Sequence, residues 1–145
     1  MIPYRRDGIK MRDMVEKFGL NAGKIWETLN KHGPLTQTRL MKEVNLKEDE
    51  FFTAIGWLAR ENKVREENST FMLGETNLTS RIGETAGKVW SLLESVGEID
   101  MEYVPKLTGV SEKEFFTAVG WLAREGKIKT KKAKPRKPRL KLGLK

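Results

Sequence analysis

The chain contains no cysteine and only one histidine, His32. The absence of thiols excludes disulfides, thiolate zinc sites and cysteine nucleophiles. A single histidine excludes multi-histidine metal sites, and a Ser-His-Asp triad would have to use His32 itself. His32 directly precedes Gly33, where a helix is expected to end, and a cation there suits the carbonyl end of the helix dipole. We therefore predict a structural role for His32, and we expect no metal and no cofactor.

Long apolar runs are also missing, since no stretch of about 18 apolar residues could span a bilayer. The first residues lack the apolar core of a signal peptide. No phosphate-binding loop, metal cluster or nucleophile constellation is present in the sequence. We expect a cytoplasmic protein that is not an enzyme, with no membrane and no small-molecule substrate as partner.

Acidic residues are absent from the last seventeen positions, residues 129–145, which carry nine basic residues. The formal net charge of the whole chain is +8. Residues 18–79 have a net charge of −1, residues 80–128 of −2, and residues 1–17 of +2. The positive charge is therefore concentrated in one segment, and such a composition is typical of polyanion binding.

The most informative positive feature is an internal repeat. The sequence of residues 51–61, FFTAIGWLARE, returns at residues 115–125 as FFTAVGWLARE, with ten of eleven positions identical. The offset of 64 residues holds without a gap from Gly19 and Gly83 to Val64 and Ile128. Such registry predicts two copies of one fold.

The order of elements within a copy indicates the fold. In the first copy the apolar spacing predicts helices over residues 21–31, from Thr36 to Val44 and over 48–61, and then a β-hairpin over 64–73. In the second copy Pro105 predicts that the middle helix is short, kinked or started at the proline. Three helices closed by a hairpin make a winged helix-turn-helix, so we predict a mainly α fold with small β-hairpins, of class α+β.

The motifs AGKIWETLNKHGPLT and FFTAIGWLAREN, with TAGKVWSLLESVGEID and FFTAVGWLAREGKI in the second copy, resemble a family of small bacterial and archaeal winged-helix domains of unassigned role. The resemblance covers residues 19–74 and 82–128. It implies the fold, and it implies function only through the habit of winged helices to bind nucleic acid. This chain differs by joining two copies and adding a basic tail.

These observations divide the chain into three parts. Residues 1–17 are expected to form a leader, helical after an Asp7 cap, that packs on a repeat. Residues 18–79 form winged-helix domain 1, and residues 80–145 form winged-helix domain 2 with an extended basic wing or tail over 129–145.

The third helix of a helix-turn-helix ordinarily enters the major groove, and its first residues meet bases and phosphates. Here those residues are Glu48, Asp49 and Glu50 in one copy and Glu112, Lys113 and Glu114 in the other. Carboxylates repel phosphates, so the sequence argues against strong groove reading. Secondary nucleic-acid candidates, for weaker contacts from domain 1, are Arg39, Lys42, Lys47, Thr53, Arg60, Lys63 and Arg65.

The second hairpin is different. We expect it to run out from Ile128, turn through a loop that contains Pro135 and Pro138, and return over Arg139 to Leu142. The leading hypothesis is a nucleic-acid-binding protein of low sequence specificity, most simply for double-stranded DNA, of nucleoid-associated or transcription-regulator type. The residues expected to bind phosphates are Lys129, Lys131, Lys132, Lys134, Arg136, Lys137, Arg139 and Lys141, flanked by Arg124 and Lys127.

A tryptophan, Trp57 or Trp121, lies on the outward strip of each third helix beside Thr53, Gly56 and Arg60 or their counterparts. Two interpretations stay open. In one, a following strand or the sister domain covers this strip. In the other, the exposed faces contact protein in an interaction or assembly module whose tail docks on RNA or an acidic partner. RNA, a protein partner and self-association therefore remain alternatives to DNA alone.

Overall fold

The computed structural model describes residues 14–134 and 137–145, with side chains described over 14–130 and 141–145. The first half of the chain forms, in order, α2 (Val15–His32), β1 (Leu35–Thr36), α3 (Gln37–Val44), α4 (Glu48–Arg60), β2 (Val64–Glu67) and β3 (Thr70–Leu73). The second half forms α5 (Thr79–Val96), β4 (Glu98–Asp100), the 3-10 helix η1 (Met101–Tyr103), α6 (Val104–Thr108), α7 (Glu112–Arg124), β5 (Ile128–Lys134) and β6 (Lys137–Leu144). The predicted α+β class and the repeated element order are confirmed.

Each hairpin gains a third strand that the sequence analysis did not anticipate. The short segment after the first helix of each repeat pairs with the returning strand, which gives antiparallel sheets of order β1-β3-β2 and β4-β6-β5. Leu35 is registered with Phe71 and Ile99 with Leu142. Phe71 and Leu142 are buried, so the middle strand of each sheet covers the core of its repeat. This arrangement of helices and sheet is a winged helix-turn-helix, present twice.

The short middle helix of the second repeat confirms the effect of Pro105. α6 contains five residues with the proline in its first turn, and η1 takes the place of its missing start. Proline is tolerated there because amides of the first turn have no partner within the helix. In the first repeat, where no proline interrupts the sequence, α3 is capped by the Thr36 hydroxyl, which accepts from the Arg39 amide.

The first helix of each repeat is longer than predicted. α2 begins at Val15 and α5 at Thr79, six residues before the expected starts at residues 21 and 85. The boundary drawn at residues 17 and 18 therefore falls inside α2. The Asp7 cap and the rest of the leader up to residue 13 lie outside the described residues. α2 ends at His32 before Gly33, whose φ of 79° is the positive value that favours glycine, as the sequence predicted.

The early starts have a physical reason, because each added turn packs on the other repeat. Phe18 of α2 belongs to the core of the second repeat, whereas Leu78 and Ile82, around the start of α5, belong to the core of the first. The Met14 amide donates to the Thr130 hydroxyl on β5 at 2.8 Å. At the corresponding place, the Asn77 side chain exchanges two hydrogen bonds with the Glu66 backbone on β2, at 3.0 and 2.8 Å. Each repeat thus holds the first helix of the other.

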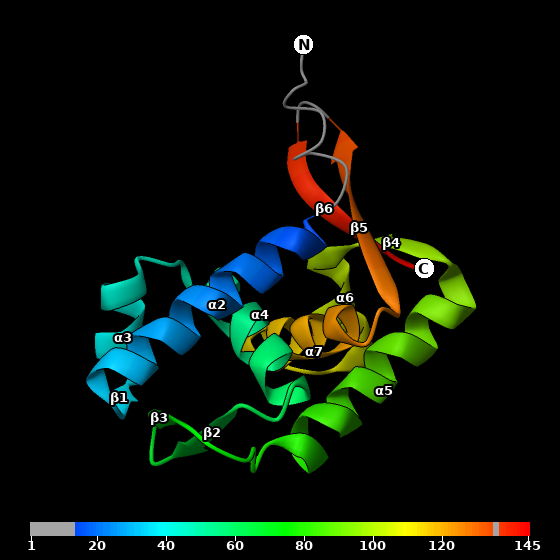
Figure 1. Cartoon of the computed structure of the whole chain (residues 1–145). Helices are drawn as coiled ribbons and strands as arrows, with labels where there is room; N and C mark the ends of the chain where they lie inside the picture. The colour runs from blue at the N-terminus through cyan, green and yellow to red at the C-terminus, as the bar shows by residue number, and fades with distance from the viewer. Residues whose placement is uncertain (1–13, 135–136) are drawn as a thin grey trace.

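The two third helices, α4 and α7, pack against each other at the centre of the molecule (Figure 1). Their closest approach is at Gly56 and Gly120. A Cβ added to Gly56 would lie 1.8 Å from the Thr117 carbonyl oxygen, and one added to Gly120 would lie 1.8 Å from the Thr53 carbonyl oxygen. The equal distances show a pseudo-twofold relation between the repeats, in which the same surface of each copy meets the other.

Charged and aromatic side chains border this contact in the same reciprocal way. The Arg60 guanidinium lies 3.0 Å from the Glu125 carboxylate, and Arg124 lies 2.9 Å from Glu61. Arg60 also lies over the Trp121 ring at 5.6 Å from its centroid, and Arg124 over Trp57 at 5.8 Å. The sister repeat therefore covers the strip that carries both tryptophans. That interpretation of the sequence is confirmed, and the strip is not the open protein-contact face that the other interpretation required.

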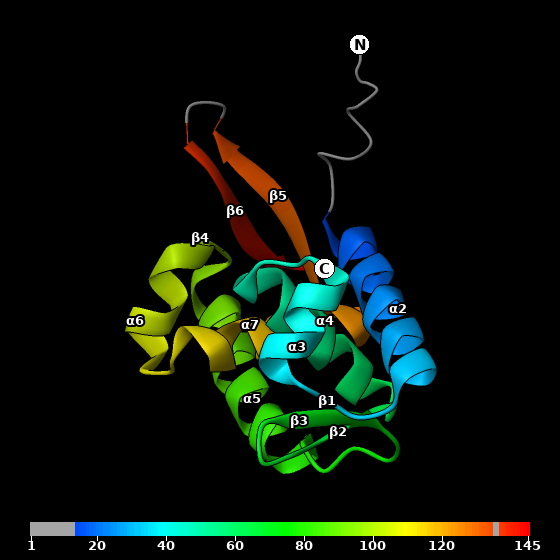
Figure 2. The same ribbon diagram turned by 90° about the vertical axis from the view of Figure 1, so that its left-hand side faces the viewer.

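The two hairpins lie at opposite ends of the molecule and differ in length. β2 and β3 have four residues each, whereas β5 and β6 have seven and eight. In both views the β5–β6 hairpin extends away from the helices, whereas β2–β3 stays close to them (Figure 1, Figure 2). The strands of the long hairpin extend further than predicted, and Pro138 lies within β6 instead of the turn. Proline fits there because β4 pairs only with residues 141–143, so β6 is an edge strand at position 138.

The glycine contact gives a direct test of the packing. We expect Gly56→Ala to lower the free energy of unfolding by about 1–3 kcal/mol or more, because the new methyl group must push two backbones apart. Urea unfolding of the full chain measures this change. The matched control is Gly87→Ala, since a Cβ at this helical glycine meets nothing within 4 Å. The control should gain up to about 1 kcal/mol of stability, because alanine favours helix over glycine. Equal effects of the two substitutions would contradict the packing.

Candidate nucleic-acid interface

The outer face of the third helix, which a groove-reading helix presents to DNA, is here used for packing between the two repeats. Eight of the thirteen residues of α4 and seven of the thirteen residues of α7 are buried. Thr53, a secondary candidate for nucleic-acid contact, is one of them, with 3% of its surface exposed. Its hydroxyl donates to the Asp49 carbonyl at 2.7 Å, so this prediction is wrong. The middles of both third helices are therefore closed to DNA.

The first turns of the third helices remain exposed, and they are acidic. Glu48 and Asp49 start α4 and are exposed, as are Glu112 and Glu114 at the start of α7. Carboxylates at a helix start complement the positive end of the helix dipole, which accounts for them structurally. Their charge repels phosphate, so the exposed ends of these helices are unsuited to meet the DNA backbone.

At Glu114, hydrogen bonds stabilise the ionised form of the carboxylate. Its carboxylate accepts a hydrogen bond from the Ser111 amide at 3.0 Å, and the Ser111 hydroxyl accepts from the Glu114 amide at 3.1 Å. Ser111 and Glu114 thus form a capping box at the start of α7. The hydrogen bonds with the Ser111 backbone and hydroxyl lower the pKa of Glu114 below its ordinary value, with a smaller contribution from the charges of Lys88 and Arg81.

Most secondary candidates of the first repeat are paired with carboxylates. Arg39 lies 3.4 Å from Glu43, and Arg65 lies 2.8 Å from Glu67 and also donates to the Glu75 carbonyl. Lys63 lies 3.5 Å from Glu61, and Arg60 pairs with Glu125 as described above. Lys42 and Lys47 are exposed, and no carboxylate of the described side chains lies within 4 Å of either. The structure therefore does not bring these candidates together as one basic surface.

The two residues expected to flank the basic wing also lie beside carboxylates. Arg124 belongs to the contact between the repeats, through Glu61 and Trp57. Lys127 lies 3.5 Å from the Glu125 carboxylate. Both are partly neutralised by these carboxylates, and their assignment as phosphate ligands stays a prediction.

The β5–β6 hairpin carries the remaining candidates. Its ladder pairs Lys129 with Gly143, Thr130 with Leu142 and Lys131 with Lys141. Thr130 and Leu142 are buried, whereas Lys129 on the alternate register position is exposed. Lys141 lies 3.7 Å from Glu98 of β4, so it is held by the sheet. A lysine registered against a lysine is an unfavourable cross-strand pair, which an anion bound at the hairpin would relieve.

The other wing candidates lie where only the backbone is described, or outside the described residues. Lys131, Lys132 and Lys134 belong to β5, and Lys137 and Arg139 belong to β6, but their side chains are outside the described set. Arg136 lies outside the described residues altogether. The backbone still places the strand candidates on one hairpin, which extends from the body of the protein (Figure 2).

Comparison with known proteins identifies the fold family. A family model described as winged helix-turn-helix domain (DUF2582) matches the chain twice, over residues 11–73 and 76–138. The chain belongs to this family. The two matches coincide with the two structural repeats, so this is a tandem arrangement of winged helix-turn-helix domains. As a class, winged helix-turn-helix domains bind nucleic acid.

A curated relative resembles one repeat. The uncharacterized protein MJ1608 of Methanocaldococcus jannaschii is 42% identical over 55 residues, which cover 36% of this chain and 77% of that protein. The relative is therefore close in length to a single winged helix-turn-helix repeat. No solved structure matches the chain significantly.

The residues that hold the wing in place were not recognised as a group in the sequence. Ile128 and Leu142 belong to the core of the second repeat, and Thr130 receives the start of α2. Their period-two alternation with lysines was a signal that could have been read as the anchored half of the hairpin. The wing of this winged helix-turn-helix is thus part of its core as well as of its surface.

In the described part of the chain no helix is long and apolar enough to cross a membrane.

The capping box makes the charge at the start of α7 testable. We expect Ser111→Ala to raise the pKa of Glu114 toward its ordinary value, because the hydrogen bond with the serine hydroxyl is lost. The stability that Glu114 contributes is present above its unfolded pKa and disappears as the pH falls through its lowered folded pKa. A carbon-detected NMR titration of the carboxyl group measures the pKa.

The control for this titration is Ser95→Ala, at an exposed serine whose hydroxyl donates within α5 and does not face Glu114. At neutral pH, loss of the N-cap serine should also cost about 0.5–2 kcal/mol of stability. A pKa of Glu114 that is the same in both variants would contradict the role given to Ser111.

Proposed function

We propose that the chain binds double-stranded DNA with little sequence selection, through the basic β5–β6 hairpin of the second repeat. In this proposal the protein acts by binding and not by turnover, and it serves the nucleoid in the cytoplasm. The third helices form the scaffold and do not enter a groove. The observation that carries the proposal is the joint placement of two features: α4 and α7 are closed against each other, and the most basic segment forms a hairpin that extends from them.

The charge distribution supports a backbone-binding hairpin. Residues 129–145 contain nine basic and no acidic residues, whereas residues 1–128 have a net charge of −1. Most of the arginines in the folded body are paired with carboxylates, as described above. Lysine and arginine that neutralise phosphates release condensed counterions, and this release favours binding irrespective of sequence. A polyanion would therefore meet its main attraction at the hairpin.

The shape of the hairpin supports contact with a duplex. β5 continues for four residues beyond the buried Thr130, about 13 Å, which is comparable to the width of the major groove of B-DNA. Basic arms of other proteins follow the minor groove or the backbone and need no base-specific contact. The short β2–β3 hairpin of the first repeat lacks this length, and its strand β2 ends with the acidic residues Glu66 and Glu67. The function is accordingly assigned to one of the two wings.

The protein-interaction alternative loses the surface on which it depended, because the tryptophan strips of α4 and α7 face each other. RNA shares the phosphate chemistry of DNA, and the experiment below separates the two. Removal of residues 129–145 would be a poor test, since β6 is the middle strand of its sheet and Leu142 is fully buried. Neutralising substitutions in the full chain keep the strands and remove the charge.

The wing variant replaces seven basic residues by glutamine: Lys129, Lys131, Lys132, Lys134, Arg136, Lys137 and Arg139. Lys141 is retained because it pairs with Glu98. We expect the variant to lose most of its affinity for duplex DNA. If about six charges meet phosphates, the wild-type slope of log K against log[salt] is about −5, and the variant slope approaches zero. Fluorescence anisotropy titrations at several salt concentrations measure both quantities.

The control has the same formal charge and a different placement. It replaces seven exposed lysines of the body by glutamine: Lys17, Lys24, Lys31, Lys42, Lys47, Lys88 and Lys106. Both variants fall from a net charge of +8 to +1. The control should keep most of the affinity, and an equal loss in the two variants would refute the wing as the binding site. Tighter binding to duplex RNA than to duplex DNA would overturn the choice of DNA.

A further inference from the structure

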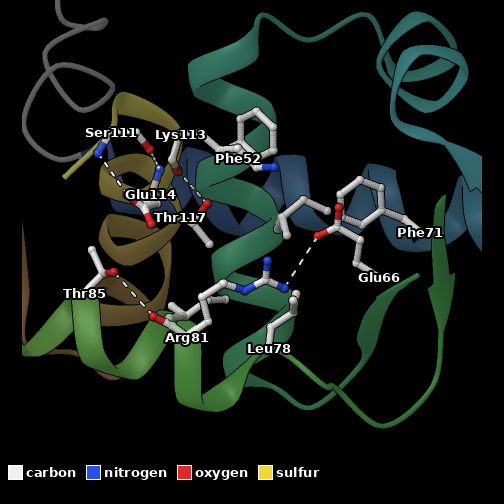
Figure 3. Close-up of a pocket in the computed structure, with 12 residues that line it drawn as sticks. Phe52, Glu66, Phe71, Leu78, Arg81, Thr85, Ser111, Lys113, Glu114 and Thr117 are labelled. Atoms are coloured by element: carbon white, nitrogen blue, oxygen red, sulfur yellow. Dashed lines mark hydrogen bonds and ion pairs between the residues drawn. The ribbon is translucent and has the colours of Figure 1, made fainter. Parts of the chain in front are cut away.

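A cavity of about 350 Å³ lies between the two repeats, on the side of the molecule that carries the β2–β3 hairpin (Figure 3). Its walls come from α4, from β2 and β3, from α5 and from the first turn of α7. The volume falls at the lower end of the range of about 300–1,000 Å³ found for ligand sites. The cavity belongs to neither repeat alone, since both contribute its lining.

The inner wall is apolar. It is formed by Phe52 and Ile55 of α4, Phe71 of β3, and Leu78 and Ile82 around the start of α5. Each of these side chains is at most 5% exposed, so the wall is part of the core of the first repeat. Two aromatic rings and three branched aliphatic groups make a surface suited to a hydrocarbon ring or a branched chain.

The rim is charged, and its two carboxylates already have partners. Glu66, with a side chain only 15% exposed, lies 4.0 Å from the guanidinium of Arg81. Glu114 is hydrogen-bonded to Ser111 at the start of α7. In Figure 3 the Arg81 side chain extends from α5 across the cavity toward Glu66. Neither carboxylate therefore requires a cationic ligand.

The positive charge of the rim is less well compensated. The Lys113 ammonium group lies 5.2 Å from the centroid of the Phe52 ring, beside the apolar wall. Among the described side chains no carboxylate lies within 4 Å of Lys113. Arg81 is 60% exposed and faces Glu66 at 4.0 Å. Lys113 is thus the cation of the described lining that has no carboxylate within 4 Å.

We propose that this cavity binds a small organic anion, a carboxylate on an aromatic or branched aliphatic body. The apolar body lies against Phe52, Phe71 and Ile82, and the carboxylate meets the ammonium group of Lys113 at the rim. The ionic contact supplies the specificity, because a carboxylate beside an apolar wall is favourable only when a cation compensates it. The site is separate from the basic hairpin and does not depend on the proposed DNA binding.

The sister repeat provides natural substitutions at the corresponding positions, 64 residues earlier in the chain. Phe18 corresponds to Ile82 and Asp49 corresponds to Lys113. Phe18 is a buried residue of the second core, so the repeat fold accepts phenylalanine there. The first-repeat residues are larger at the apolar wall and of opposite charge at the rim. The features that favour an anion therefore occur around Ile82 and Lys113 and not around their counterparts.

The experiment uses the full chain and three matched probes: 3-phenylpropanoate, the neutral 3-phenylpropanamide and the cationic 3-phenylpropylamine. Chemical shifts of the backbone amides are followed by NMR as each probe is added at millimolar concentration. We expect 3-phenylpropanoate to shift amides around Ile82, Thr85 and Lys113, and the amide and the amine to bind at least about tenfold more weakly, which corresponds to 1.4 kcal/mol.

Two variants separate the wall from the rim. Ile82→Phe introduces the residue of the sister repeat into the cavity and should abolish binding. Lys113→Ala removes an exposed ammonium group and should weaken binding of the carboxylate by about tenfold, without an equal effect on the amide probe. The control, Lys24→Ala, removes an exposed lysine of α2 remote from the cavity and should bind as the wild type does.

Three results would overturn the proposal: no shift with 3-phenylpropanoate, equal binding of the three probes, or full binding by Lys113→Ala. If thermal unfolding shows that Ile82→Phe does not fold, Lys113→Ala alone decides the question, because the Lys113 side chain is exposed and only its ammonium group lies over the Phe52 ring. DNA is absent from every measurement, so failure here and failure of the wing as a DNA-binding site are distinguishable.

Discussion

The contact between Gly56 and Gly120 is the constraint on which the rest of the structure depends. Because neither residue has a Cβ, the backbones of α4 and α7 approach so closely that each glycine faces a threonine carbonyl of the other helix. This approach brings Arg60 to Glu125 and Arg124 to Glu61, and it places each tryptophan under an arginine of the opposite repeat. A single residue type at one position of the repeat therefore fixes the relation between the two halves.

The contact between α4 and α7 also makes the groove-reading function suggested by the fold unsuitable for this chain. In a groove-reading winged helix, the third helix offers its outer face to bases. Here that face joins the repeats, and the exposed first turns of α4 and α7 are acidic. The basic surface that remains for a polyanion is the β5–β6 hairpin. The hairpins differ between the repeats more than any other element does. The third helices of the two copies are nearly identical in sequence, and each is the packing partner of the other, whereas the hairpins differ in length and charge.

Much of this architecture could be predicted from residues close together in the sequence. The 64-residue repeat and the effect of Pro105 on α6 rest on local patterns, and the structure confirms both. The sequence also placed Thr53, Gly56, Trp57 and Arg60 on one outward strip of the third helix. It could not decide what covers that strip, because helical periodicity gives a direction and not a partner.

The features that the sequence did not reveal are pairings between distant segments. Arg124 and Arg60 were taken as candidates for phosphate without knowledge of their carboxylate partners, which lie 63 and 65 residues away in the chain. The long first helices were missed for a similar reason, since Phe18 and Ile82 find their apolar surroundings in the opposite repeat. The cavity depends on the same exchange of helix starts between the repeats, and no local sequence pattern indicates it. Sequence spacing cannot reveal contacts that exist only once two copies have assembled.

The exchange of helix starts also makes the two halves a single folding unit. A chain of this length could in principle hold two modules that melt separately, but here each hydrophobic core is completed by a side chain from the opposite half. Opening one half removes the cover of the other, and a partly unfolded molecule would expose apolar surface on both sides of the break. The two winged helix-turn-helix domains are therefore expected to unfold together as one cooperative unit.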